Sequence, residues 1–320
     1  MTLPDHTQSL GHQVYAIDTG FERARFDAAY LVVDDGRATF IDTGHNAAVP
    51  RLLEALAALG LAREAVDWVI PTHVHLDHAG GAGLLMRHLP QAKALIHPRG
   101  ARHLVNPLAL VEGARAVYGV EVVQQTYGTI EPIPAERVVE SHDEMTILVG
   151  QRPLRLIDTP GHARHHHCVW DARSRGWFTG DTFGISYREF DTAAGAWIFP
   201  STTPVQFEPD ALHRSIDRLL AVEPLVLYPT HFSQVTDVPR LAAQFRALLD
   251  QFVSGALALR KEIPTDRTAR LARLMAMVEA ALLASARAAG VTMPEDTARA
   301  LLQMDVTLNA QGIDVWLSKV

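Results

Sequence analysis

The residues best suited to chemistry lie in one short segment, His73-Val74-His75-Leu76-Asp77-His78. Imidazole nitrogens and carboxylate oxygens are ligands that zinc, iron and manganese take in proteins. A catalytic metal commonly takes three protein ligands and keeps one position open, so four ligand groups exceed the need of one ion. The spacing therefore predicts two metals, with His73 and His75 on one and Asp77 and His78 on the other.

A chance histidine-rich turn is the alternative interpretation of this segment. With 16 histidines in 320 residues, the pattern would arise by chance about 0.003 times per chain. Three later segments each place a ligand group at the end of an apolar run: Asp158-Thr159-Pro160-Gly161-His162, Phe178-Thr179-Gly180-Asp181-Thr182 and Tyr228-Pro229-Thr230-His231. Loops above a rigid sheet commonly carry functional sites. The repeated placement favours a metal site over coincidence.

The composition argues against several classes of function. Hydrophobic residues make up 48% and charged residues 20% of the chain, which is typical of a globular protein with a sizeable core. The formal charge is −7 and no basic cluster stands out, so charge gives no reason to expect nucleic acid or an anionic membrane as a partner. We expect a small-molecule substrate instead.

Cysteine usage and hydropathy predict a cytoplasmic protein. Cys168 is the only cysteine and cannot form an intrachain disulfide, which fits a reducing compartment. Residues 1–13 contain no apolar stretch typical of a secretory signal. Residues 274–289 are the most apolar stretch, but Glu279 and Arg287 interrupt it and it is too short to span a bilayer.

Short apolar runs between turn signals predict the strands and helices that position the ligand segments. Residues 29–33 and 37–42 flank Asp34-Asp35-Gly36 and predict a hairpin. Residues 49–59 have helical periodicity that ends at Gly60. Further strands are expected at residues 13–17, 68–70, 94–97, 137–140, 145–149, 154–158, 167–170, 177–179 and 225–228, and further helices at 83–89, 106–118 and 209–221.

The pattern changes to helices alone from about residue 238. Apolar residues at helical spacing occupy 241–252 and 271–282, and Thr292 with Glu295 resembles a capping box that starts another helix. We therefore expect a metal-binding catalytic domain at 1–236 and a helical C-terminal extension at 237–320. The Ala- and Leu-rich extension makes a homodimer through these helices a further expectation.

Five segments together resemble the metallo-β-lactamase superfamily, and within it the branch similar to glyoxalase II. They follow one another in the family's order across residues 41–231: Ile41-Asp42-Thr43-Gly44, THVHLDHAG at 72–80, TPGHARHHHC at 159–168, FTGDT at 178–182 and Pro229-Thr230-His231. The resemblance implies an α/β fold, the four-layer αβ/βα metallo-β-lactamase-type sandwich, with the metals at one edge between the two sheets and the helical extension following it.

The resemblance also implies a role for each motif residue. Three histidines would hold the first metal: His73, His75 and His162. An aspartate and two histidines would hold the second: Asp77, His78 and His231. Asp181 would bridge both metals, and Asp42 would be a buried aspartate that orients the metal-binding loop without touching metal.

Position 181 distinguishes branches of this family. Metallo-β-lactamases that open antibiotics typically use a cysteine there, so Asp181 argues against a true β-lactamase. An aspartate bridge suits a dinuclear hydrolase with two divalent metal ions, for which we expect zinc, with iron or manganese as alternatives. Relatives that bind iron and do redox chemistry typically carry a flavin domain, and none is evident in the sequence.

The second histidine cluster matches the family motif only in part. His166 corresponds to the second histidine of the glyoxalase-type GHTxGH pattern, but Ala163 and His165 replace its threonine and glycine. His166 is therefore a candidate catalytic residue, close to the metals or facing substrate, with a core histidine as the alternative. His165 and His167 receive no role from the motif and would point opposite to His166 on an extended segment.

The expected reaction is attack by a metal-bridging hydroxide on a carbonyl substrate, namely a thioester, ester or lactone. Asp77 would help to manage the proton, and the loop after Asp181 would contact substrate through Phe183, Tyr187 and Arg188. Weaker candidates for the same rim are Phe21, Arg23 and Arg25. The helical extension shows no glutathione-binding pattern, which argues against glyoxalase II activity itself.

Two other classes of function remain open from the sequence. A phosphodiesterase could use the same metals, although the net charge and the lack of a large inserted domain argue against a nucleic-acid substrate. A metal-containing signalling or interaction protein with little turnover is the other class. Substitution of Asp77 separates this last class from the two hydrolase classes, because it would abolish function if chemistry matters and spare it if only binding does.

Overall fold

The computed structural model describes residues 2–260 and 266–320. The chain forms two compact units. The first comprises Met1–Asp158, His165–Gly180 and Val226–Gln234, and the second comprises Thr159–Arg164, Asp181–Leu225 and Val235–Val320. The second unit thus contains the helical extension together with two earlier segments. The division into a catalytic domain at 1–236 and a helical extension at 237–320 stays a prediction.

The first unit contains a seven-stranded sheet whose order follows the chain from β1 to β7. Strands β1 to β4 pair antiparallel, and β4 to β7 pair parallel. Its strands are β1 Thr7–Ser9, β2 Val14–Asp18, β3 Ala28–Asp34, β4 Arg37–Ile41, β5 Val66–Ile70, β6 Lys93–Ile96 and β7 Val138–Glu140. The predicted hairpin is confirmed: Asp34 pairs with Arg37, and Asp35 and Gly36 at the turn both take positive φ, as a two-residue hairpin loop requires.

A five-stranded sheet in the same unit has the order β12-β11-β10-β9-β8. Its strands are β8 Thr146–Val149, β9 Arg152–Asp158, β10 His167–Asp171, β11 Gly176–Gly180 and β12 Val226–Pro229. The two sheets share a buried apolar cluster, to which Ile41 and Ile70 contribute from the first sheet and Leu156 and Phe178 from the second. This shared core holds the ends of β5, β11 and β12 in fixed positions, and the ligand segments follow those ends.

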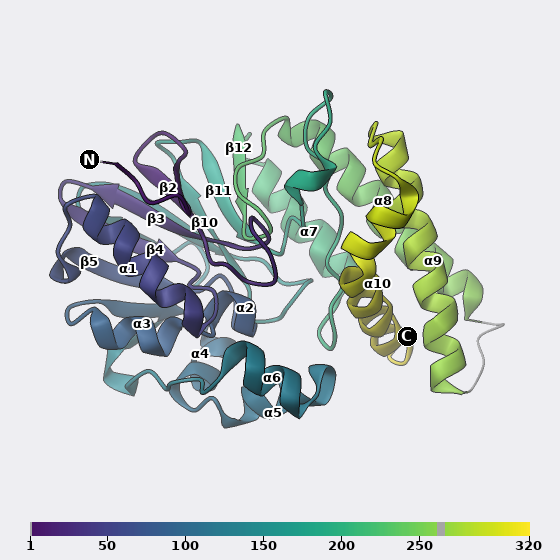
Figure 1. Cartoon of the computed structure of the whole chain (residues 1–320), viewed down its shortest axis with the longest axis horizontal. Helices are drawn as coiled ribbons and strands as arrows, with labels where there is room; N and C mark the ends of the chain where they lie inside the picture. The colour runs from purple at the N-terminus through teal and green to yellow at the C-terminus, as the bar shows by residue number, and fades with distance from the viewer. Residues whose placement is uncertain (1, 261–265) are drawn as a thin grey trace. The chain divides into compact units, whose positions relative to one another are not determined.

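Helices cover the outer face of the seven-stranded sheet (Figure 1). The apolar stripe of α1, including Leu52 and Leu56, packs with Leu85 and Met86 of α3 against Phe40 and other strand residues. The helices of the first unit are α1 Val49–Ala58, α2 Leu76–Ala79, α3 Ala82–His88, α4 Pro98–Val105, α5 Leu108–Tyr118 and α6 Val120–Tyr127. Short 3-10 helices lie at Asn46–Ala48, Arg63–Ala65 and Ala135–Arg137.

The second unit is built mainly from helices α7 Pro209–Leu220, α8 Val238–Leu259, α9 Arg267–Ala288 and α10 Glu295–Leu317, with a 3-10 helix at Arg188–Phe190. Most residues of the predicted apolar stripes are buried, among them Phe245, Leu274 and Leu282, whereas Leu271 and Met275 are half-buried. The predicted capping box is wrong in detail. Helix α10 begins at Glu295, and its capping residue is Pro294, whose side chain has no acceptor and so cannot cap it. Glu295 also stands one residue rather than three after the capping position.

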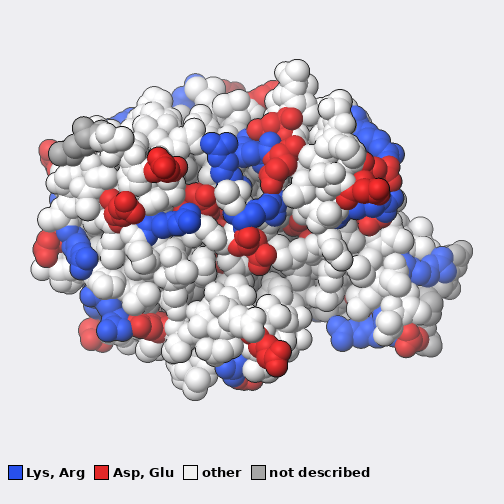
Figure 2. All heavy atoms as spheres, viewed as in Figure 1, with Lys and Arg blue, Asp and Glu red and all other residues white. Residues whose placement is uncertain are grey.

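The αβ/βα sandwich with a C-terminal helical extension is therefore confirmed. Among the residues that the structure describes, no helix has the length and hydropathy needed to cross a membrane. Figure 2 shows basic and acidic side chains interspersed on one face, in keeping with the mixed composition of the sequence.

Candidate metal centre

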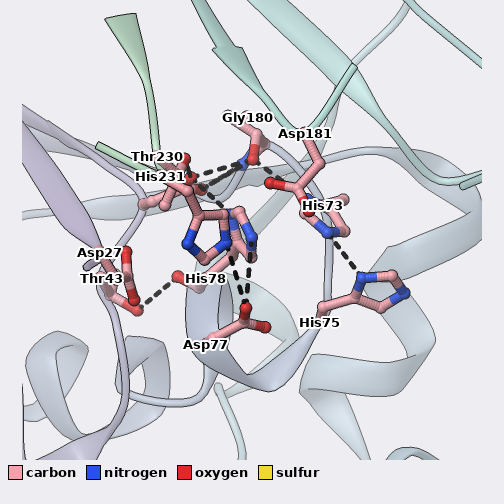
Figure 3. A network of polar contacts seen from close by, with 12 residues as sticks. Asp27, Thr43, His73, His75, Asp77, His78, Gly180, Asp181, Thr230 and His231 are labelled. Atoms are coloured by element: carbon pink, nitrogen blue, oxygen red, sulfur yellow. Dashed lines mark hydrogen bonds and ion pairs between the residues drawn. The ribbon is translucent and has the colours of Figure 1, made fainter. Parts of the chain in front are cut away.

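The loop after β5 brings two histidines together. β5 ends at Ile70, and the chain runs through Pro71, Thr72 and His73 before α2 begins at Leu76. The side chains of His73 and His75 face each other, with His73 Nε2 2.8 Å from His75 Nδ1 (Figure 3). Tetrahedral zinc with nitrogen ligands would hold two such atoms about 3.4 Å apart, so a small outward rotation of the rings fits an ion.

A second group of ligand atoms lies one turn further along. The Asp77 carboxylate oxygen Oδ2 lies 3.5 Å from His231 Nε2 and 3.7 Å from His78 Nε2. One ligand atom from each of Asp77, His78 and His231 lies within 4.8 Å of the other two. Figure 3 shows the two histidine rings and the carboxylate pointing toward one another. Two imidazoles and one carboxylate are a donor set that suits zinc, iron or manganese.

Asp42 fixes which nitrogen of His78 faces Asp77. Its carboxylate is buried and accepts hydrogen bonds from the Thr72 backbone N–H (2.7 Å) and the Thr230 hydroxyl (2.7 Å), and it lies 2.9 Å from His78 Nδ1. Asp42 takes a left-handed backbone conformation, φ +55°, directly after β4. These contacts tie the ends of β4, β5 and β12 to one carboxylate and leave His78 Nε2 for the ligand side.

His231 is oriented in the same manner by backbone. Its Nδ1 lies 3.1 Å from the carbonyl oxygen of Phe26, which leaves Nε2 toward Asp77. The Phe26 ring also meets the His231 ring edge-on, with 5.3 Å between ring centroids. Each of these histidines therefore has one nitrogen held by the protein and the other directed at Asp77.

The second unit contains the remaining two predicted ligands, His162 and Asp181. His162 Nε2 lies 3.6 Å from Asp181 Oδ2, and His162 Nδ1 lies 3.0 Å from the carbonyl oxygen of Ser201. His162 follows Gly161, whose φ is +137° and whose Cβ, if present, would lie 2.4 Å from the backbone of Leu212. Only glycine fits there, so the turn that presents His162 requires it.

The three histidines at 165–167 have different surroundings. His166 is fully buried and stacks on His73 at 4.8 Å. A Cβ added to Gly180 would lie 2.6 Å from His166 Nε2, so this ring is packed tightly against the end of β11. His166 therefore lies behind His73 in this structure, and its catalytic role stays a prediction.

His165 and His167 point to other neighbours. The His165 ring stacks on His73 at 6.2 Å, and its Nδ1 lies 3.5 Å from the Val74 backbone N–H. His167 is buried and bonded to Ser141, with its Nδ1 2.9 Å from the hydroxyl oxygen. Burial lowers the pKa of His167 to about 3, with a smaller lowering contribution from His97, so its imidazole is neutral.

The predicted substrate contacts after Asp181 are engaged within the second unit. Phe183 is buried and packs on Phe245 at 5.7 Å, and the Tyr187 hydroxyl donates to Asp305 at 3.0 Å. Arg188 donates to the Ser186 carbonyl at 2.9 Å. Contacts within the second unit explain the positions of Phe183 and Tyr187. The substrate role of all three residues stays a prediction.

The weaker rim candidates lie in the first unit. Phe21 is buried, and the Arg23 guanidinium lies 4.6 Å from the centre of the Phe26 ring. The Arg25 backbone N–H donates to the Asp18 carboxylate at 3.2 Å, and Arg25 has φ +59°.

Sequence reasoning missed Asp27, which is buried beside the second ligand group. Burial raises the pKa of Asp27 well above its ordinary value, electrostatic interactions with His231 and His78 oppose this, and Asp77 and Asp42 add to it. Neither carboxylate oxygen has a hydrogen-bond partner among residues 2–260 and 266–320. The signal available in the sequence was an aspartate directly before the apolar run of β3.

The residues described above lie in a part of the chain that matches a known protein family. Residues 23–231, well over half of the chain, match the family model described as the metallo-beta-lactamase superfamily. This chain belongs to the metallo-beta-lactamase superfamily. The matched range contains every residue predicted to hold metal.

One member of the superfamily is similar to this chain in both sequence and structure. ST1585, a metallo-beta-lactamase fold-containing protein from Sulfurisphaera tokodaii, is 29% identical over 170 residues, covering 52% of this chain and 60% of that protein. The crystal structure of ST1585, an archaeal superfamily protein from Sulfolobus tokodaii, matches with a TM-score of 0.66 at 22% identity and covers 95% of this chain and 98% of that one. This structural likeness shows the shared fold.

Two enzymes are also similar over part of the chain. An atrochrysone carboxyl ACP thioesterase from Aspergillus fumigatus is 27% identical, covering 56% of this chain and 42% of that protein. A hydroxyacylglutathione hydrolase from Rhodospirillum rubrum is 30% identical, covering 42% of this chain and 40% of that protein. The alignments thus span about 40 to 60% of the length of these curated relatives.

Proposed function

We propose that this protein is a divalent-metal-dependent hydrolase that cleaves a carbonyl substrate, namely a thioester, ester or lactone. The observation that carries the proposal is the convergence of Asp77, His78 and His231, with His78 held by Asp42 and His231 by the Phe26 carbonyl. Ligands held in this way favour a functional metal site, because the partner on the other nitrogen fixes each ring. The names of the thioesterase and hydroxyacylglutathione hydrolase relatives favour carbonyl hydrolysis over other reactions.

We propose two ions per chain, with zinc expected and iron or manganese as alternatives. His73 and His75 form one pair of ligands and Asp77, His78 and His231 form the other group. His162 and Asp181 are proposed as the remaining ligands on the family motif. Chain connectivity supports this assignment, because Asp181 directly follows β11 and His162 follows β9 by four residues.

The residues of the chain would divide the work as follows. Divalent ions, when bound, supply activated water and polarise a carbonyl oxygen. Asp77 presents one carboxylate oxygen to two histidines and is 24% exposed in its side chain, so it is the ligand best able to accept a proton from a water molecule. Asp42, fully enclosed, keeps His78 in one orientation. His166, behind His73, would support that ring rather than meet substrate.

The test is a hydrolysis screen of the metal-replete protein against thioesters, lactones, aryl esters, phosphodiesters and a cephalosporin. His75→Ala serves as the control, and elemental analysis gives metal per chain. We expect two ions per chain and turnover of one carbonyl class that disappears in the variant. Turnover of phosphodiesters alone would instead assign a phosphodiesterase. Two bound ions without turnover of any compound would favour a signalling role and overturn the hydrolase proposal.

The cellular setting follows as a set of proposals. A cytoplasmic location, a small-molecule substrate, and the absence of nucleic-acid and membrane partners fit the composition and charge. A homodimer through the C-terminal helices is proposed from the Ala- and Leu-rich sequence. Light scattering at tens of micromolar protein tests it directly, since a mass near 35.1 kDa would show a monomer.

A further inference from the structure

The second unit contains a cavity of about 570 Å³ between helices α8 and α9, and all of its lining residues belong to that unit. The two helices lie side by side (Figure 1). Arg240, Gln244, Ala247 and Gln251 line the cavity at intervals of three or four residues, so they share one face of α8. This face is about 16 Å long. The volume lies within the range of sites that bind small molecules.

The walls of the cavity are mostly apolar and are made of short side chains. Six of the ten lining residues are alanine or leucine. Leu248 is buried, whereas Ala247, Ala284 and Ala288 are exposed. Methyl side chains leave the space between the two helices open. A long cavity with such walls suits an alkyl chain, because binding removes the apolar surface of the chain from water.

Arg240 is the one charged residue that lines the cavity within the described part of the chain. Its guanidinium is held by the protein, since Nε donates to the Asp237 carboxylate at 2.6 Å and Nη2 donates to the Ala196 carbonyl at 3.0 Å. Arginine has five N–H donors, so three remain without a partner among residues 2–260 and 266–320. A carboxylate matches this fork of donors. Its single charge also suits one arginine better than a phosphate monoester, which carries nearly two.

Two more lining residues have one bond to the protein and one hydrogen-bonding group left over. Gln244 Nε2 donates to the Ile198 carbonyl at 2.8 Å, which leaves the amide oxygen as an acceptor. Ser285 Oγ accepts the indole N–H of Trp197 at 3.0 Å and keeps its own hydrogen to donate. Apolar walls with a few fixed polar groups are typical of small-molecule sites.

We propose that this cavity binds a small organic carboxylate that carries an alkyl chain. Arg240 binds the carboxylate group, and the chain lies along the alanine walls between α8 and α9. No lining residue is a predicted metal ligand or substrate contact. The proposal can therefore be tested separately from the hydrolase proposal, and the two can fail independently.

The experiment titrates octanoate, and octanamide as its neutral analogue, into the metal-replete full chain labelled with nitrogen-15 at tryptophan. The chain has five tryptophans, and Trp197 reports on the cavity through its bond to Ser285. Trp197→Phe assigns the indole signal by its loss. We expect octanoate to shift this signal with a Kd of about 1 mM. Octanamide should bind about 10-fold more weakly, because it lacks the charge that Arg240 recognises.

Arg240→Gln tests the role of the charge, and Arg246→Gln is the matched control. Both arginines lie on α8 and pair with an aspartate, and their side chains are 33% and 35% exposed. Only Arg240 lines the cavity. We expect Arg240→Gln to bind octanoate about 10-fold more weakly and to lose the preference over octanamide, whereas Arg246→Gln binds as wild type does.

Ala247→Leu fills the cavity without a change of charge, and Ala243→Leu, at an exposed position of α8 outside the lining, is its control. We expect only Ala247→Leu to weaken octanoate binding. Equal affinity of wild type for the two compounds, or unchanged affinity in Arg240→Gln, overturns the proposal. A Trp197 signal that stays fixed well above the expected Kd also overturns it. Loss of a dimer in Ala247→Leu alone, without octanoate binding, would assign the groove to a second copy of the chain and overturn it too.

Discussion

The two histidine clusters of the first unit place the same residue type in different surroundings. In the 73–78 segment, His78 has one nitrogen held by Asp42 and the other directed at Asp77, and His73 faces His75 across 2.8 Å. In the 165–167 segment, the contacts are a ring stack, a tight fit against Gly180 and a bond to Ser141. The groups around each ring, and not the residue type, distinguish the histidines that are candidate metal ligands from the histidines that pack in the core.

The difference has a physical basis in what lies opposite each nitrogen. A carboxylate within 4 Å, as Asp77 provides for His78 and His231, completes a donor set that a cation satisfies. His167 meets a hydroxyl and is so deeply buried that its charged form is strongly disfavoured. A neutral, enclosed imidazole behaves as a polar core residue. The comparison thus predicts opposite responses to the same substitution in the two clusters.

The sharpest test of this contrast is one substitution made in each cluster. His78→Gln removes a nitrogen from the Asp77 group, whereas His165→Gln changes a ring that stacks on His73 from the side. We expect His78→Gln to lower metal affinity by more than about 100-fold, because loss of a partner behind a ligand already costs 10- to 100-fold. Elemental analysis and competition with a chelator measure it.

His165→Gln should leave metal content at the wild-type value. Equal metal loss in both variants would show that the 165–167 cluster also holds metal, and the contrast between the clusters would collapse.

The packing around His166 can be tested through Gly180. A Cβ at Gly180 would lie 2.5 Å from Thr72 Oγ1 and 2.6 Å from His166 Nε2, at φ +46°. We expect Gly180→Ala to lower the free energy of unfolding of the metal-free protein by about 3 kcal/mol, from backbone strain and overpacking together. Gly36→Ala is the matched control, because Gly36 has φ +71° and no atom within 4 Å of the added Cβ.

The control isolates backbone strain, which should cost about 1 kcal/mol. Urea denaturation of both variants gives the difference. Equal losses would mean that His166 and Thr72 move aside easily, and that the ring behind His73 is loosely held.

The ligand side of the contrast depends on Asp42. Asp42→Asn keeps the size of the side chain but replaces a charged acceptor with an amide beside His78, Thr72 and Thr230. We expect metal affinity to fall by about 10- to 100-fold with little change in fold. Metal titration followed by circular dichroism checks both statements. Unchanged affinity would show that the backbone alone orients His78.

Much of the frame of this molecule could be predicted from sequence. The hairpin at Asp34 to Arg37, helix α1 and the strand before His73 all follow local rules of periodicity and turn chemistry. The ligand segments were recognisable because each combines rare residue types with a fixed spacing. Such local signals predict the structure correctly because the buried core fixes the strand ends that the ligand segments follow.

The parts that escaped prediction depend on contacts between distant segments. Helix α6 begins with Val120, Val122 and Val123, residues that favour strands, yet it is helical in the folded chain. Tyr127 lies beside Phe21, and Asp27 lies near His231, because of tertiary packing that no local sequence pattern predicts. Phe183 and Tyr187 are the opposite case. Their closeness to Asp181 in sequence predicts contact with substrate, yet both side chains are buried.

The packing side of the contrast is tested by acid. Burial holds the pKa of His167 at about 3, below its value in the unfolded chain, so protonation favours the unfolded state. Its contribution is fully present above pH 6.5 and is lost as the pH falls toward 3. Between pH 7.5 and 5.5 this one residue should remove about 1.4 kcal/mol from the free energy of unfolding of the metal-free protein.

His167→Gln should flatten that part of the stability profile, whereas His142→Gln, at an exposed position, should leave its slope unchanged. Urea denaturation at a series of pH values measures all three proteins. A slope that persists in His167→Gln would mean that folding does not lower the pKa of His167. The distinction between ligand histidines and core histidines would then no longer rest on charge.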